Sequence, residues 1–293
     1  MKILLTGKNG QVGFELQKKL SVMGEVIATD REDLDLADPD AIRAFIDQTK
    51  PDIIINTAAY TAVDKAESEP DLTYQINASA PEVLAAKAAE LDIPLVHFST
   101  DYVFDGLKQE AYVEIDPTNP QSFYGKTKHD GEEKIRNHPK HIILRTSWVF
   151  GSHGNNFLKT ILRLIMEKES LNIVSDQWGS PASSCMLADA TFKIVDTILK
   201  NKNFNDYGTY HVTSDGETNW FDYASLISSE AMKSNVKVTC APDKIHPILT
   251  SEYPTAAKRP LNSRLNTDKL KKTFMLELPH WESEVKRVLK EII

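Results

Sequence analysis

A glycine-rich turn near the amino terminus decides the fold class: Gly7-Lys8-Asn9-Gly10-Gln11-Val12-Gly13. It follows a short β-like run at residues 2–6 and precedes a helical pattern over residues 11–20. Glycine lets the backbone turn sharply and approach a pyrophosphate, and a helix amino terminus offers free N–H groups to phosphate oxygens. A strand, this turn and a helix, in that order, are typical of the first unit of a dinucleotide-binding domain.

Strands and helices alternate after the glycine turn. Strand-like segments occur at 25–29, 51–56, 95–100 and 141–145, separated by helical patterns at 39–49, 80–91 and 124–137. The runs at 51–56 and 95–100 are apolar on both faces, which indicates a parallel sheet covered by helices on both sides. We therefore predict an α/β fold with a Rossmann-type, doubly wound parallel sheet.

The alternation weakens beyond about residue 148. Helical patterns there occur at 156–168, 186–200, 220–233 and 280–292. We predict a dinucleotide-binding domain over residues 1–148 and a smaller α/β lobe that binds substrate over 149–293. We also expect the segments 175–200 and 236–258 to return to the first domain.

Composition narrows the class of protein. A net charge of −8 opposes nonspecific binding to nucleic acid, and two distant cysteines, Cys185 and Cys240, cannot form a disulfide framework. The eight histidines show no His-Glu-x-x-His spacing, so we interpret them as structural or solvent-facing. No apolar run resembles a signal peptide or a membrane span. We expect a cytoplasmic protein that binds neither nucleic acid nor membrane.

The segment Tyr124-Gly125-Lys126-Thr127-Lys128 places a tyrosine and a lysine on one face of a helix. A nearby ammonium favours the phenolate of a residue that otherwise titrates near pH ~10. Thr100 ends a buried strand, at the edge where open α/β sheets bind ligands. We interpret Thr100 as a hydrogen-bond donor to a substrate carbonyl that Tyr124 protonates while a nicotinamide hydride attacks the carbon. A surface helix and an ordinary strand end would show the same pattern.

Charged residues leave the choice of cofactor open. Asp30 ends the second strand, where a carboxylate accepts hydrogen bonds from an adenosine ribose, which favours NADH. Arg31 beside it is suited to stack on adenine or to pair with the 2′-phosphate of NADPH. An ordinary acidic turn would look similar. Lys258 and Arg259, with Arg264 nearby, form a cation cluster for an anionic substrate, or a solvated loop.

Seven motifs, in order along nearly the whole chain, resemble the dTDP-4-dehydrorhamnose reductase family. They are the glycine turn, Asn56-Thr57-Ala58-Ala59-Tyr60-Thr61-Ala62-Val63-Asp64, Ser99-Thr100-Asp101-Tyr102-Val103-Phe104-Asp105-Gly106, Tyr124 to Lys128, Arg145-Thr146-Ser147-Trp148, Gly154-Asn155-Asn156-Phe157 and Arg259-Pro260-Leu261-Asn262-Ser263.

This resemblance implies an extended short-chain dehydrogenase that reduces dTDP-6-deoxy-L-lyxo-4-hexulose at its 4-keto group to dTDP-L-rhamnose, a polysaccharide precursor. The catalytic set it implies is Thr100, Tyr124 and Lys128. The expected cofactor contacts, with Arg31 included, are Gly7, Asn9, Gly10, Gln11, Val12, Asp30, Arg31, Ala58, Ala59, Tyr60, Tyr124 and Lys128. The residues placed near the sugar nucleotide are Thr100, Tyr102, Val103, Trp148, Asn156 and Arg259.

For some members of this family, the resemblance also implies a dimer in which magnesium bridges carboxylates. Glu15 and Glu291 stand at plausible positions here, but Cys185 takes the third. A thiol weakens such a site because a hard cation prefers oxygen ligands. We expect either a monomer or a homodimer, and we expect that a dimer would not depend on a metal.

Two other functions fit part of the pattern. Sugar-nucleotide dehydratases of the superfamily carry two acids after the strand-ending threonine, whereas here Tyr102 follows Asp101. An epimerase keeps the same threonine, tyrosine and lysine. A non-catalytic subunit similar to the regulatory partner of methionine adenosyltransferase would also keep these motifs.

Overall fold

The computed structural model describes residues 1–234 and 236–293, and its centre is a six-stranded parallel sheet. The strands, in the order β10-β5-β4-β3-β1-β2, are β10 (Gly208–His211), β5 (His141–Thr146), β4 (Leu95–Thr100), β3 (Ile53–Asn56), β1 (Lys2–Thr6) and β2 (Glu25–Thr29). Every neighbouring pair runs parallel, so all six carboxyl ends meet at one edge. This confirms the predicted doubly wound α/β fold.

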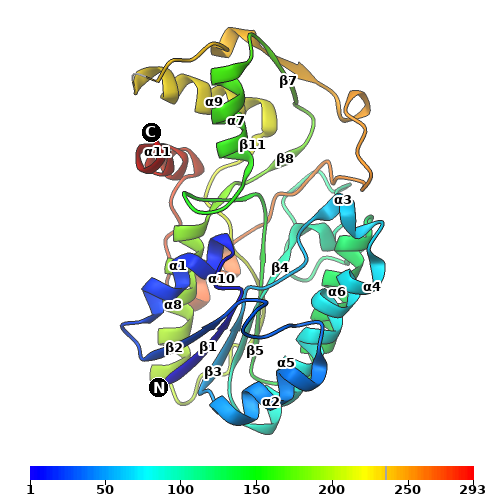
Figure 1. Ribbon diagram of the computed structural model, residues 1–293, viewed down its shortest axis with the longest axis vertical. Helices are drawn as coiled ribbons and strands as arrows, with labels where there is room; N and C mark the ends of the chain where they lie inside the picture. Colours follow the sequence, from blue (N-terminus) through cyan, green and yellow to red (C-terminus); the bar gives the residue numbers. More distant parts are fainter. Residues whose placement is uncertain (235) are drawn as a thin grey trace.

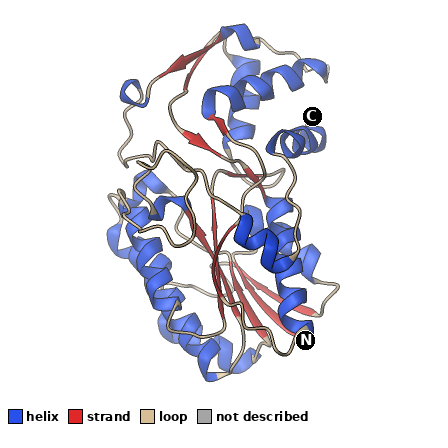
Figure 2. Ribbon diagram, turned by 180° about the vertical axis from the view of Figure 1, so that it is seen from behind, coloured by secondary structure: helices blue, strands red, loops and turns tan. Residues whose placement is uncertain are grey.

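Helices cover both faces of the sheet (Figures 1 and 2). One face packs against α1 (Gln11–Leu20), α8 (Ser184–Lys200) and α10 (Asp268–Phe274). The other packs against α2 (Pro39–Thr49), α5 (Ala80–Glu90) and α6 (Phe123–Ile135). The chain between β3 and α5 contains α3 (Val63–Ala66), α4 (Pro70–Tyr74) and the π-helix η1 (Gln75–Ser79), and the 3-10 helix η2 (Asp101–Val103) follows β4.

The second lobe lies beyond the carboxyl edge of the sheet and has its own apolar core (Figure 1). Its helices are α7 (Phe157–Glu167), α9 (Trp220–Lys233) and α11 (Trp281–Ile292), with short 3-10 turns η3 (Pro242–Lys244) and η4 (Thr250–Glu252). Its short strand pairs are β6 (Val149–Phe150) with β9 (Ala182–Ser183), β7 (Leu171–Val174) with β12 (Ile245–Ile248), and β8 (Trp178–Gly179) with β11 (Thr218–Asn219).

The segments that return to the first core differ in part from the expectation. Helix α8, within the range 175–200, packs against α1. In the range 236–258, β12 pairs with β7 and Ile245 is buried in the second-lobe core, whereas Ala257 at the end of the range donates from its backbone nitrogen to Asp64 of the first lobe at 3.0 Å. Strand β10 extends the central sheet, although the sequence pattern predicted no strand at its four residues.

Among the described residues, no helix combines the length and the apolar character needed to cross a membrane.

A buried ion pair fastens α6 to the central sheet. Arg145 of β5 donates two hydrogen bonds to Glu132 of α6, at 2.9 Å from Nε to Oε1 and 2.6 Å from Nη2 to Oε2. Both side chains are fully buried, and Ser99 of β4 donates a third bond to Glu132. Burial alone would raise the pKa of Glu132, but the bonds and charge of Arg145 lower it below its ordinary value. The carboxylate therefore stays ionised inside the fold.

Replacing one partner of this pair tests its contribution. Arg145→Met leaves the Glu132 carboxylate buried without its main partner, so we expect the free energy of unfolding to fall by ~3–5 kcal/mol. The control is Arg163→Met, which breaks the exposed pair between Arg163 and Glu167 and should cost no more than ~0.5 kcal/mol. Urea denaturation followed by circular dichroism measures both. Equal, small losses would contradict a structural role for the buried pair.

Candidate functional site

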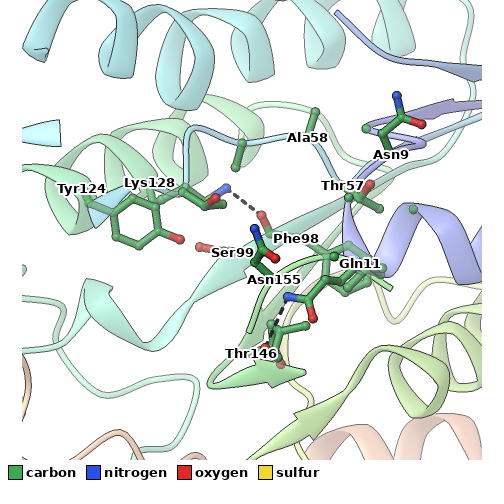
Figure 3. A pocket seen from close by; sticks show the side chains of 18 residues that line it. Asn9, Gln11, Thr57, Ala58, Phe98, Ser99, Tyr124, Lys128, Thr146 and Asn155 are labelled. Carbon is green, nitrogen blue, oxygen red and sulfur yellow. Dashed lines mark hydrogen bonds between the residues drawn. The ribbon is translucent and has the colours of Figure 1, made fainter. Parts of the chain in front are cut away.

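A cavity of about 460 Å³ opens at the carboxyl edge of the sheet, between the two lobes (Figure 3). Its lining combines the glycine turn, the ends of β3, β4 and β5, the first turns of α6 and one loop of the second lobe. The lining residues are Gly7, Asn9, Gly10, Gln11, Val12, Gly13, Thr57, Ala58, Ala59, Thr61, Phe98, Ser99, Tyr124, Lys128, Thr146, Val149, Gly154 and Asn155. Nine residues predicted from sequence are therefore brought together here: Gly7, Asn9, Gly10, Gln11, Val12, Ala58, Ala59, Tyr124 and Lys128.

The glycine turn leaves no room for side chains on two of its residues. Gly7 has a φ of +80°, and a Cβ built on it would lie 2.9 Å from the Ala58 nitrogen. A Cβ on Gly13 would lie 2.1 Å from the Gly7 carbonyl oxygen. The turn thus packs directly on the end of β3, and α1 begins at Gly10 without a side-chain cap. Its first N–H groups face the cavity and are suited to bind a pyrophosphate.

A loop of the second lobe crosses the glycine turn. Asn156 donates from Nδ2 to Gln11 Oε1 at 2.9 Å, and Gln11 donates from Nε2 to the Val149 carbonyl at 3.4 Å. The His153 ring stacks on Phe14 of α1, with ring centroids 4.0 Å apart. Asn156, which we predicted near the sugar nucleotide, thus holds the cofactor turn and does not line the cavity.

Asp30 lies beside the glycine turn, at the end of β2. Its carboxylate accepts from Asn9 Nδ2 at 2.7 Å and from the backbone nitrogen of Glu32 at 2.9 Å. Desolvation opposes ionisation, but the backbone bonds from Glu32 and Asp33 together with Lys8, at 3.4 Å, lower the pKa of Asp30 overall. Arg31 is largely exposed and pairs with Asp35 at 3.7 Å. Asp30 and Arg31 do not line the cavity, and neither does Tyr60, which hydrogen-bonds Glu69.

Tyr124 and Lys128 point into the cavity from one face of α6 (Figure 3). Burial raises the pKa of Tyr124 well above its ordinary value, and the Thr100 hydroxyl lowers it only in part. This differs from the expectation that Lys128 favours the phenolate. The ammonium donates to the Phe98 carbonyl at 2.7 Å and lies 3.1 Å from His97 Nε2, so among the described residues its hydrogen bonds go to β4 and not to Tyr124. Tyr124 is therefore a neutral phenol, the form that donates a proton.

Burial also acts on Lys128. It lowers the pKa of Lys128 to about 8, against the opposing charge of Glu132. Thr100, outside the cavity lining, donates from Oγ1 to Asp101 Oδ1 at 3.0 Å and accepts from the Tyr102 nitrogen at 3.2 Å. Burial raises the pKa of Asp101 to about 6. The Thr100 hydroxyl must turn away from Asp101 before it can donate to a substrate.

The predicted sugar-nucleotide residues fall into two groups, neither of which lines the cavity. Arg259 donates from Nη1 to the Tyr102 hydroxyl at 3.2 Å and pairs with Asp64 at 2.5 Å. Burial raises the pKa of Tyr102 to about 12, although the Arg259 charge lowers it in part. These two side chains form one polar cluster. Val103 belongs to the other group, because its side chain is fully buried in a small apolar core with Phe104.

Trp148 also belongs to the packed group. Its ring stacks on Trp220 with centroids 3.5 Å apart, and a Cβ built on Gly179 would lie 2.6 Å from its Cε2 atom. Protein atoms of Trp220 and Gly179 therefore contact the indole, which is only partly buried. Its φ of +49°, rare for a bulky residue, shows that surrounding contacts hold the backbone in place.

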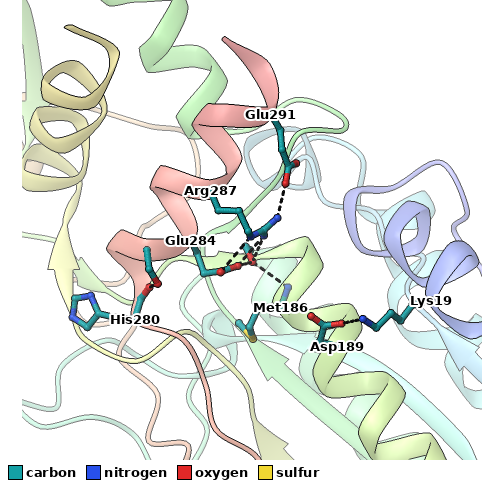
Figure 4. Close-up of polar contacts among 9 residues, drawn as sticks. Lys19, Met186, Asp189, His280, Glu284, Arg287 and Glu291 are labelled. Carbon is teal, nitrogen blue, oxygen red and sulfur yellow. Dashed lines mark hydrogen bonds and ion pairs between the residues drawn. The ribbon is translucent and has the colours of Figure 1, made fainter. Parts of the chain in front are cut away.

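Arg287 lies close to Glu291 and Cys185, two of the three residues considered for magnesium. Glu291 pairs with Arg287 at 2.6 Å, and Asp189 of α8 pairs with Lys19 (Figure 4). Cys185 also belongs to α8. Burial raises the pKa of the Cys185 thiol, which keeps it neutral. No group of three or more His, Cys, Asp or Glu residues suited to a metal occurs in the described part of the chain. The neutral thiol of Cys185 and the pairing of Glu291 with Arg287 do not favour binding of magnesium by Glu15, Glu291 and Cys185.

Comparison with known proteins shows the family. The family model described as RmlD substrate binding domain matches residues 1–293. A dTDP-4-dehydrorhamnose reductase of Salmonella typhimurium is 45% identical over 297 residues, covering 100% of this chain and 98% of the relative. This chain belongs to the dTDP-4-dehydrorhamnose reductase family. The resemblance read from its motifs is thereby confirmed.

Solved structures of this family superpose along the whole chain. A dTDP-4-dehydrorhamnose reductase from Clostridium acetobutylicum matches with a TM-score of 0.92 and 41% identity, covering 100% of this chain and 99% of that one. A dTDP-4-dehydrorhamnose reductase from Bacillus anthracis in complex with NADP matches with a TM-score of 0.90 and 36% identity, covering 99% of both chains. The two-lobed arrangement is thus shared with reductases of this family.

Several cavity residues were not singled out from the sequence of this family member. Thr57 donates from its hydroxyl to the Thr6 carbonyl at 2.6 Å and packs under Gly7. Asn155 and Thr61 lie within motifs quoted for the resemblance, next to residues that were chosen. Thr146 ends β5 at the same edge as Thr100 ends β4, so the strand-end rule would have found it.

The packing of Trp148 yields a prediction about the second lobe. Gly179→Ala places a Cβ inside the indole, so we expect the Trp148 ring to move and the near-ultraviolet circular dichroism of the stacked tryptophans to decrease. Gly10→Ala is the control, because its Cβ would lie 3.3 Å from the nearest atom, in the first lobe. An unchanged spectrum in Gly179→Ala would show that the ring is not held as described.

Proposed function

We propose that this chain reduces the 4-keto group of dTDP-6-deoxy-L-lyxo-4-hexulose to dTDP-L-rhamnose, using NADPH or NADH. The observation that carries this proposal is that Tyr124 and Lys128 open into the same cavity as the glycine turn. A proton donor thus faces the space where a dinucleotide would lie. Membership of the reductase family supplies the choice of sugar nucleotide.

The chain's residues fit a nicotinamide dinucleotide. The uncapped amino terminus of α1 and the side-chain-free surface at Gly7 and Gly13 suit a pyrophosphate. Asp30, held ionised beside the turn, suits ribose hydroxyls, and Lys8 next to it suits a 2′-phosphate. When bound, the nicotinamide supplies the hydride. Both charges, which lie beside the glycine turn, support use of either cofactor.

The proposed proton donor is Tyr124. Hydride addition to a ketone creates an alkoxide, which needs a proton as its charge develops. Tyr124 keeps its proton because burial penalises the phenolate, and its hydroxyl faces the cavity. Before the reaction Lys128 contacts β4 and leaves Tyr124 neutral. We infer that its positive charge stabilises the phenolate only as the proton is transferred. We infer that Thr100, once it turns from Asp101, orients the carbonyl oxygen.

The anionic part of the substrate has a candidate partner in Arg259. Its guanidinium is held between Asp64 and the Tyr102 hydroxyl, close to η2 and the end of β4. A diphosphate would compete with the Asp64 carboxylate for this guanidinium, and bidentate pairing favours the phosphate. We infer that Arg259 and Tyr102 bind the diphosphate. We also infer that Trp148 contributes to substrate binding through the edge of its ring and through its packing against neighbouring residues.

The experiment that tests this function follows NADPH absorbance, and then NADH absorbance, with the purified protein. The substrate is dTDP-4-keto-6-deoxyglucose, added with and without the 3,5-epimerase that makes the L-lyxo sugar. Oxidation that requires the epimerase supports the proposal. No oxidation of either cofactor, despite binding, would favour a non-catalytic subunit, and oxidation without the epimerase would favour a different sugar.

Removing the Tyr124 hydroxyl should abolish most turnover. We expect Tyr124→Phe to lower kcat by about 10²–10⁴-fold, because it keeps the ring but removes the proton donor. NADPH affinity, measured by fluorescence titration, should stay the same. The control is Tyr223→Phe, a buried tyrosine of the second lobe whose hydroxyl has no partner among the described residues. Equal turnover in both variants would remove Tyr124 from the mechanism.

The alkaline limb of the activity profile should reflect Lys128. Its ammonium is charged below a pKa of about 8 and neutral above it, whereas an exposed lysine stays charged beyond pH ~10. We therefore expect kcat/KM to fall as pH rises through about 8. Lys128→Arg keeps its charge at higher pH, so any activity that remains should lose this limb. A rate that stays level to pH ~10 in the unmodified protein would contradict the assignment.

A further inference from the structure

A row of buried polar side chains lies behind Lys128, across three neighbouring strands. Thr6 of β1, Asn56 of β3 and His97 of β4 are register partners, so they lie side by side on one face of the sheet. Thr6 Oγ1 donates to Asn56 Oδ1 at 2.5 Å, and Asn56 Nδ2 lies 2.9 Å from His97 Nδ1. His97 Nε2 lies 3.1 Å from the Lys128 ammonium, which ends the row.

This row interrupts an apolar face of the sheet. On the same strands, Leu4, Ile54 and Leu95 are buried in the core beneath α5 and α6. Asn56 and His97 are no more than 1% exposed, and burying such groups is unfavourable unless they are hydrogen-bonded. Each polar atom along the row has a partner, and the row leads from the sheet to the one charged group at its end.

The chemistry of the row depends on the charge of Lys128. An ammonium has three donors and no acceptor, and the Phe98 carbonyl takes one donor. His97 accepts the second only when its Nε2 carries no proton, which places its proton on Nδ1, toward Asn56. An asparagine amide can present its oxygen or its nitrogen to the ring, and the Thr6 hydroxyl can accept or donate accordingly. The row can therefore adjust to either protonation state of Lys128.

His97 is suited to remain neutral. Desolvation lowers the pKa of His97 well below its ordinary value, and the nearby Lys128 charge lowers it further. A neutral imidazole offers a lone pair to the ammonium without competing for the charge.

We propose that His97, held by Asn56, is a positioning residue that fixes the direction and the proton affinity of Lys128, and so acts on Tyr124 during the proposed reduction. Phe98 and His97 take two of the three donors of Lys128, which itself lines the cavity, so the third donor is left for a group bound there. His97 does not line the cavity, so it acts only through Lys128. This role extends the proposed function to a residue behind the site.

The other charged groups near Lys128 are held by partners other than His97, so we expect them to stay in place when His97 is changed. Glu132, four residues along α6, raises the pKa of Lys128, and it is itself paired with Arg145 of β5. Tyr124 faces the cavity from the same helix, and Asp101 of η2 lies near Tyr124. A change in the titration of Lys128 in His97 variants is therefore assigned to the lost acceptor.

The test is a titration of Lys128 in the full chain by ¹³C NMR of its Cε atom, assigned by its loss in Lys128→Met. His97→Leu removes the acceptor, which disfavours the ammonium, so the midpoint should shift down by about one to two pH units. His97→Gln places an amide oxygen where Nε2 was, so it should keep the midpoint within about half a unit of the unmodified protein. The alkaline limb of kcat/KM should move with these midpoints.

The outcomes separate this proposal from the function itself. An unchanged Lys128 midpoint in His97→Leu, with only a lower melting temperature, would overturn the positioning role. If His97→Leu does not fold, His97→Asn takes its place, since its shorter amide reaches Asn56 but not Lys128. The NMR titration needs no turnover. A shifted midpoint in a protein without reductase activity would therefore support the role of His97 and contradict only the reaction.

Discussion

A lysine ammonium buried against the carboxyl end of β4 is the constraint on which the site depends. Lys128 is 1% exposed, and its hydrogen bond to the Phe98 carbonyl fixes α6 relative to the sheet. The pair between Arg145 and Glu132, one helical turn further along, fixes the same helix again. With α6 anchored at both points, Tyr124 has one direction open to it, into the cavity beside the glycine turn.

The two lobes complete this cavity together. The parallel sheet brings the ends of its strands and the glycine turn to one edge, and the second lobe supplies the loop that crosses the turn. Contacts from Asn156 to Gln11 and from His153 to Phe14 join residues more than a hundred positions apart. Gln11, which lines the cavity, therefore also joins the glycine turn to the second lobe.

Sequence predicted the parts of the molecule that local pattern controls. The glycine turn, the apolar strands and the helix carrying Tyr124 and Lys128 could be read because each has its own period or spacing. Strand β10 could not, since four residues after a turn carry too short a pattern and gain their place from β5. Trp148 and Val103 were placed at the sugar from motif order, but their surroundings come from segments distant in sequence. His97 looked like an ordinary strand residue for the same reason.

The central claim is that a nicotinamide bound in the cavity transfers a hydride to the 4-keto carbon while Tyr124 supplies the proton. The most direct measurement uses NADPH carrying deuterium at both C4 positions of its nicotinamide, with the L-lyxo keto sugar, and locates the label in the product by NMR. The account predicts one deuterium on C4 of dTDP-L-rhamnose. Deuterium on another sugar carbon, or a rhamnose product without deuterium, would contradict it.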